Sequence, residues 1–250
     1  MAGFKIALIN EIEKLYKKKK LLVAVIISLM FIIVGQVAVI GVRFGFGIRG
    51  SSSMEFPILV LSVVVNSILP LFTALITIDS FSGEFSQNTM KISLTRPITR
   101  LKFFTAKLTA ILVYILFNLY FVMVLSMLAG ILFNSNSFTL KAIINIIVSY
   151  TVTALPMMIL ALIIVILANI MRSGIGVFFT TILIFIVFKV LEVVFSRYSG
   201  MFFTSMFDWY NLWIMSSFPL LKIIRKFMMI LSYGIILFTS GYYLFDKKDF

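Results

Sequence analysis

The chain has 250 residues, of which 62% are hydrophobic and 12% charged, and its mean hydropathy is +1.14. Soluble domains average about 45–50% apolar and about 25% charged residues, and so large an apolar excess in water would drive aggregation. The sequence therefore predicts an all-α integral membrane protein. The absence of Cys and His excludes disulfides, Cys/His metal sites and His-dependent nucleophiles.

The formal net charge of +13 does not indicate a nucleic-acid partner. A nucleic-acid surface needs basic residues gathered on one face of a folded domain. Here Lys and Arg lie at the edges of long apolar runs, where anchoring at the membrane surface explains them. We therefore expect contact with membrane lipid and none with nucleic acid.

Residues 4–16 have the pattern of an amphipathic helix. Apolar side chains recur every three or four residues, and charged residues stand between them, namely Phe4, Leu8, Ile12 and Leu15 against Lys5, Glu11, Glu13 and Lys14. Because the basic run 17–20 follows, we expect an interfacial helix on the inner membrane surface. A solvated lead-in with no membrane contact is the alternative.

Six apolar segments follow, each with roughly the 20 residues needed to cross about 30 Å of hydrocarbon. They are residues 21–42, 56–78, 108–133, 143–171, 174–195 and 227–245. Pro156 predicts a tilt or kink in the fourth segment, and Pro70 predicts a bend in the second. With no linker or internal repeat to divide the chain, we expect one transmembrane domain over residues 1–250.

The distribution of positive charge predicts that both termini are cytoplasmic. With that orientation, 14 of the 22 Lys and Arg residues face the cytoplasm. Three basic residues do not fit this enrichment of Lys and Arg on the cytoplasmic side, because they fall on the outer side just before the last segment: Lys222, Arg225 and Lys226. The aromatic stretch 196–226 is too apolar for a free loop, so we expect short re-entrant helices there, with Trp and Tyr at headgroup level.

A few polar residues interrupt the apolar segments. Lys189 and Glu192 are three apart and so share a helix face, either as a self-satisfied pair near the outer interface or as part of a pathway or dimer contact. Asn66 and similar Asn residues favour hydrogen bonds between helices, with a polar path as the alternative.

The stretch from Ser82 to Arg100, SGEFSQNTMKISLTRPITR, is the most specific in the sequence. It resembles the first cytoplasmic loop of ABC-2-type exporter permeases, in which an acidic residue precedes a turn and a run like L-L-S-R-P-[VI]-[ST]-R, with Lys at the start of the third helix. The matching residues are Leu94, Arg96, Pro97, Ile98, Thr99, Arg100 and Lys107, while Asn88 and Thr95 replace the usual Gly and Ser.

The resemblance implies a permease subunit in a bacterial plasma membrane, with a cytoplasmic coupling helix in the loop 79–107. The coupling residues would be Glu84, Phe85, Gln87, Asn88, Thr89, Met90, Lys91, Ile92, Arg96, Pro97 and Arg100. The resemblance also implies that ATP and Mg²⁺ bind a partner ATPase and that this chain is not itself an enzyme, and the absence of a G-x-x-x-x-G-K-[ST] motif agrees with this.

The resemblance also implies a dimer around a central path lined by the second and fifth segments, with Asn66, Phe72, Lys189 and Glu192 as candidate pathway residues. Permeases similar to this chain export lantibiotics or phenol-soluble modulins or protect against bacitracin, so an amphipathic or hydrophobic peptide is the expected substrate. A secondary transporter or channel without an ATPase is the alternative. A lipid-modifying enzyme would need a polar catalytic cluster that the sequence does not supply.

Overall fold

The computed structural model of the chain describes residues 2–17, 20–46, 52–86, 98–134, 139–171, 173–215 and 217–248. Over these ranges every regular element is a helix. In chain order they are α1 (Ala2–Lys17), α2 (Lys20–Phe46), α3 (Phe56–Asn66), α4 (Ile68–Ser80), α5 (Ser82–Ser86), α7 (Arg100–Phe133), α8 (Leu140–Ile170), α9 (Gly174–Val194), the 3₁₀ helices η1 (Ser196–Met201) and η2 (Phe203–Tyr210), α10 (Asn211–Ile214) and α11 (Leu220–Asp246).

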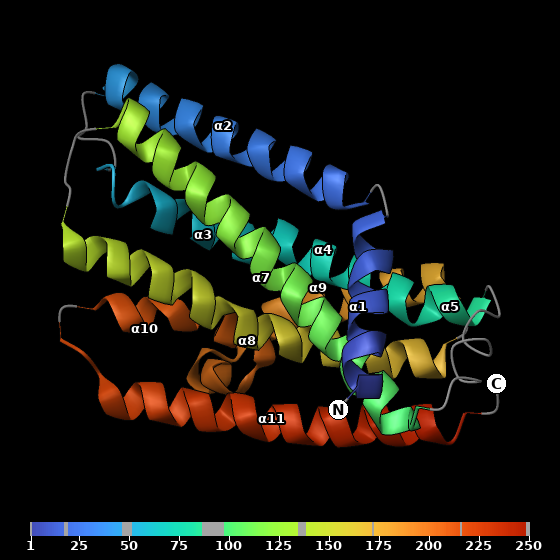
Figure 1. Cartoon of the computed structure of the whole chain (residues 1–250). Coiled ribbons are helices and arrows are strands. Elements are labelled where there is room, and N and C mark those ends of the chain that lie inside the picture. Colours follow the sequence, from blue (N-terminus) through green and yellow to red (C-terminus); the bar gives the residue numbers. More distant parts are fainter. Residues whose placement is uncertain are drawn as a thin grey trace.

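The long helices lie along one another and α1 lies across them (Figure 1). In that view α2, α7, α8 and α11 extend along the bundle, whereas α1 crosses α7 steeply and α5 marks the right-hand end. The N- and C-termini both lie in that half of the view. Residues 4–16 lie within α1, and the contact of this helix with the membrane surface stays a prediction.

Five helical stretches in the described part of the chain are long and apolar enough to cross a membrane. They are Leu22–Gly41, Ile68–Phe85, Arg100–Phe133, Leu140–Ile170 and Gly174–Val194. The predicted sixth span, 227–245, lies inside α11, which is not one of these five and carries Lys222, Arg225 and Lys226 in its first two turns. The sixth crossing therefore stays a prediction.

The second predicted segment, 56–78, is interrupted three residues before Pro70, where the sequence predicts a bend. Helix α3 ends at Asn66, Ser67 takes a non-helical backbone conformation (φ −126°, ψ −75°), and α4 begins at Ile68. Pro70 explains the position of the break, because it has no N–H to donate to the Asn66 carbonyl and its ring clashes with that group. By contrast, α8 continues through Pro156.

The loop predicted over 79–107 is shorter than expected at both ends. Helix α4 continues to Ser80, α5 follows after one residue, and α7 already begins at Arg100. The Thr99 hydroxyl accepts a hydrogen bond from the Lys102 backbone N–H at 3.4 Å, so it caps the start of α7. The predicted span begins at 108 because the apolar run begins there. The helix itself begins two turns earlier, since charged residues after Thr99 are compatible with helical structure.

The short helices η1, η2 and α10 occupy the aromatic stretch, and their re-entrant position in the membrane stays a prediction. Lys226 of α11 holds them in place, since its Nζ donates to the Gly200 carbonyl at 3.2 Å and to Ser205 Oγ at 2.9 Å. Phe207 of η2 stacks on Phe185 of α9 with ring centroids 6.0 Å apart. Lys226, one of the three basic residues that do not fit the positive-inside distribution, therefore stabilises the short helices.

Candidate functional site

A buried lysine, Lys107, joins three elements at the end of the bundle that carries α5. Its side chain is completely buried, and its Nζ lies 2.8 Å from Glu11 Oε2 of α1 and 2.9 Å from Glu84 Oε2 of α5. It also donates to the Ser80 carbonyl at 2.9 Å. Helices α1, α4, α5 and α7 thus meet at one ammonium group.

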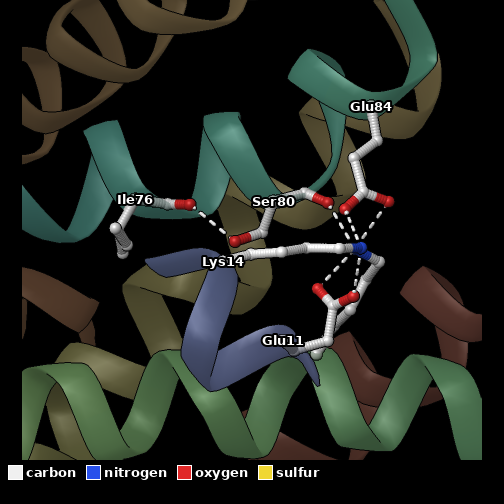
Figure 2. A network of polar contacts seen from close by, with 6 residues as sticks. Glu11, Lys14, Ile76, Ser80 and Glu84 are labelled. Carbon is white, nitrogen blue, oxygen red and sulfur yellow. Dashed lines mark hydrogen bonds and ion pairs between the residues drawn. The ribbon is translucent and has the colours of Figure 1, made fainter. Parts of the chain in front are cut away.

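Lys14 closes the cluster from the outside. Its half-exposed ammonium lies 2.7 Å from Glu11 Oε1 and 3.0 Å from Glu84 Oε1, so each carboxylate faces both lysines. Figure 2 shows Glu11 and Glu84 pointing toward each other from opposite sides, with the ammonium nitrogen between them. We call Glu11, Lys14, Glu84 and Lys107 the ion cluster, whose formal charges sum to zero.

The charges of the ion cluster also shift the pKa values of Glu11 and Lys14. Burial opposes ionisation of Glu11, but Lys107 and Lys14 outweigh that effect and hold the pKa of Glu11 below its ordinary value. For Lys14, burial acts to lower the pKa, but hydrogen bonding and charge attraction from Glu11 and Glu84 outweigh it and raise the pKa. Glu11 and Lys14 are therefore both charged near neutral pH.

The local sequence explains why these groups meet. Helix α4 ends at Ser80, which leaves the Ser80 carbonyl free to accept from Lys107. Phe81 is fully buried at the junction with α5, and the Lys107 ammonium lies 5.7 Å from its ring centroid and 4.9 Å from that of Phe103. The aromatic faces add a cation–π attraction to the two carboxylates.

The C-terminal end of α11 packs against the same region. Phe245 is fully buried with its ring centroid 5.4 Å from that of Phe104. Lys248 donates to the Asn169 carbonyl at the end of α8, at 2.9 Å, and its ammonium lies 3.7 Å from the centroid of Phe85 in α5. The Arg100 guanidinium donates to the Asp246 carbonyl. Helix α5 is thus held by α1, α7 and the C-terminal segment together.

Comparison with known families shows what kind of protein has this arrangement. A family described as ABC-2 family transporter protein matches residues 7–187, which covers most of the chain and contains the whole ion cluster. The chain belongs to the ABC-2 transporter family. No curated protein matches it. With its five apolar spanning stretches, this membership makes the chain a multi-pass membrane transport component.

The predicted coupling residues of this ABC-2 protein are only partly described. Glu84 lies in the ion cluster, Phe85 beneath Lys248, and Arg100 at the first turn of α7. Gln87, Asn88, Thr89, Met90, Lys91, Ile92, Arg96 and Pro97 lie outside the described residues. The contact with an ATPase stays a prediction for all of them.

Glu11, Lys14 and Lys107 form the rest of the cluster and were missing from the predicted coupling set. Glu11 was assigned to the polar face of the first helix, and this was wrong, because it is only 4% exposed. It stands four residues from both Ala7 and Leu15, which are buried too, so this stripe is the one that faces α7. The spacing of Glu11 from Ala7 and Leu15 is the sequence signal that could have indicated its burial. A buried carboxylate needs a cation as partner.

The predicted pathway residues of the ABC-2 protein have different local surroundings. Asn66 donates to Asp208 Oδ1 at 3.2 Å, while Phe72 lies in the core. Lys189 and Glu192 form the expected pair on α9, with Nζ and Oε2 3.6 Å apart. Their role in a pathway stays a prediction.

Proposed function

We propose that this ABC-2 protein is the permease subunit of an ATP-driven exporter, working as a dimer with separate ATPase subunits that hold ATP and Mg²⁺. One observation carries the proposal. Glu84 stands in α5, at the start of the loop expected to contact the ATPase, and it is ion-paired with Lys107 of the 34-residue helix α7.

The ion cluster is suited to transmit motion from that loop. A shift of α5 must either carry Lys107 with it or separate a buried ion pair, and breaking such a pair costs about 3–5 kcal/mol. Because Glu11 binds the same ammonium, α1 moves with the pair. ATP-driven movement of the loop would therefore displace α1 and α7 together and change the helix bundle between inward-open and outward-open states.

The test is to coexpress the chain with the genes that flank its own, to ask whether a P-loop ATPase copurifies, and to measure ATP turnover in membranes. We expect the two proteins to copurify and Glu84→Gln to bind the ATPase normally while reducing permease-dependent ATP turnover at least fivefold. Glu13→Gln, which removes an exposed acid of α1 that is not part of the ion cluster, is the control. The proposal is wrong if no ATPase copurifies, or if both variants stimulate ATP turnover as the wild type does.

The proposed substrate is an amphipathic or hydrophobic peptide, and the apolar composition of the spanning helices supports this class. Helix α9 leaves large apolar side chains such as Phe179, Leu183 and Val190 on its surface, which suits contact with a second copy or with lipid. Reconstituted vesicles with the ATPase should move a labelled amphipathic peptide only when ATP is present. Movement driven by an ion gradient without ATP would favour a secondary transporter instead.

A further inference from the structure

A groove of about 970 Å³ opens at the end of the bundle opposite the ion cluster. Its walls come from the start of α3, the start of α8, and the η2–α10 segment. Helix α8 runs from this groove to Asn169, which contacts Lys248 near α5, so the two sites lie at opposite ends of one helix (Figure 1). The volume lies within the range of pockets that bind small molecules or part of a peptide.

The groove has two carboxylates that come from distant parts of the sequence. Glu55 is exposed, and its Oε2 accepts a hydrogen bond from the Ser52 backbone N–H at 2.9 Å. Asp208 is half-buried, and its Oδ1 accepts from Asn66 at 3.2 Å. Both carboxylates line the groove, so a ligand that enters it meets two acidic groups.

The rest of the lining is mixed in polarity. Ile58, Leu59 and Ile146 supply apolar surface, and Ser62, Asn145 and Tyr210 supply hydrogen-bonding groups. Among the described residues that line the groove none is basic, although the chain as a whole has 22 basic and 9 acidic residues. The described lining is therefore acidic in a chain that is basic overall, which favours a positively charged ligand with apolar parts.

We propose that the groove binds a segment of a cationic amphipathic peptide, with basic side chains at Glu55 and Asp208 and apolar side chains against the isoleucine and leucine wall. This rests on the proposed function only for the outward orientation of the groove and for a peptide as the ligand class. The two acids stand on separate walls and match a ligand with two or more cations. A lipid carrying one ammonium group would leave one acid without a partner.

The experiment measures binding to the purified chain alone in nanodiscs of zwitterionic lipid, with no ATPase and no ATP. The probe is a fluorescein-labelled amphipathic peptide of leucine and lysine, and the same peptide with glutamate in place of lysine is its control. We expect the lysine peptide to bind and the glutamate peptide not to bind. The double variant E55Q/D208N should weaken binding of the lysine peptide at least tenfold.

Two further variants separate the groove from general charge attraction. Glu13→Gln removes an exposed acid of α1 that does not line the groove, so it should leave the dissociation constant unchanged. Ala142→Trp fills the groove without changing its charge and should weaken binding at least fivefold. Equal binding by wild type and E55Q/D208N, or normal binding by Ala142→Trp, would overturn the groove as the site. Because no ATPase is present, either result leaves the coupling proposal untouched.

Discussion

At the scale of single residues, Lys107 should matter more than any exposed lysine of the same helix. Lys107→Met would leave Glu11 and Glu84 buried with only the half-exposed Lys14 to balance them, so we expect a loss of about 3–5 kcal/mol of stability. Thermal unfolding in detergent measures this. Lys102→Met, an exposed position on the first turn of α7, is the control and should change stability by less than about 0.5 kcal/mol.

The same residue offers a test of coupling inside the cluster. Glu11→Gln added to Lys107→Met restores the charge balance, so the double variant should be more stable than the sum of the two single losses implies. Strict additivity of the two unfolding free energies would show that Glu11 and Lys107 do not interact.

A second residue-scale prediction concerns pH and Glu11. Because the pKa of Glu11 is held below its ordinary value of 4.5, the stabilisation is present above pH 4.5 and is lost as the pH falls through the lower folded-state pKa. The melting temperature of the wild type should therefore fall more steeply below about pH 4.5 than that of Glu11→Gln. Glu13→Gln, whose acid pairs with Lys17 at the surface, should retain the wild-type slope.

At the scale of elements, the close approach of α7 to the turn at Ser53 can be tested through Gly130. A Cβ placed on Gly130 would come within 2.4 Å of the Ser53 carbonyl oxygen, and that atom belongs to backbone. Gly130→Ala should therefore push the turn away from α7 and cost about 1–3 kcal/mol of stability in thermal unfolding. Gly35→Ala on α2 meets nothing within 4 Å and should be neutral or slightly stabilising, so equal losses in both variants would contradict the prediction.

The element scale also shows how far sequence reasoning reaches. Apolar run length located α2, α8 and α9 to within a few residues, because a spanning helix must satisfy its backbone internally over about 20 residues. It did not place the break at Ser67, since apolar composition is the same on both sides of it. It did not find the partners of Lys107 either, because Glu11 lies 96 residues away and the contact depends on how α1 packs on α7.

At the scale of the whole molecule, the orientation of the bundle decides whether the groove and the ion cluster face opposite compartments. The chain has no Cys, so each introduced Cys is a unique label site. Exposed lysines lie at both ends of the bundle, and four of them make two pairs for labelling: Lys102 with Lys141, and Lys247 with Lys222.

We expect a membrane-impermeant maleimide added to intact cells to label Lys141→Cys and Lys222→Cys and to spare Lys102→Cys and Lys247→Cys until the membrane is opened. Lys102 and Lys141 mark the N-terminal ends of α7 and α8, and Lys222 and Lys247 mark the two ends of α11. Labelling of Lys102→Cys and not Lys141→Cys would reverse the orientation and place the acidic groove in the cytoplasm. Equal accessibility of Lys222→Cys and Lys247→Cys would show that α11 does not cross, because a helix that spans the bilayer must expose its ends on opposite sides.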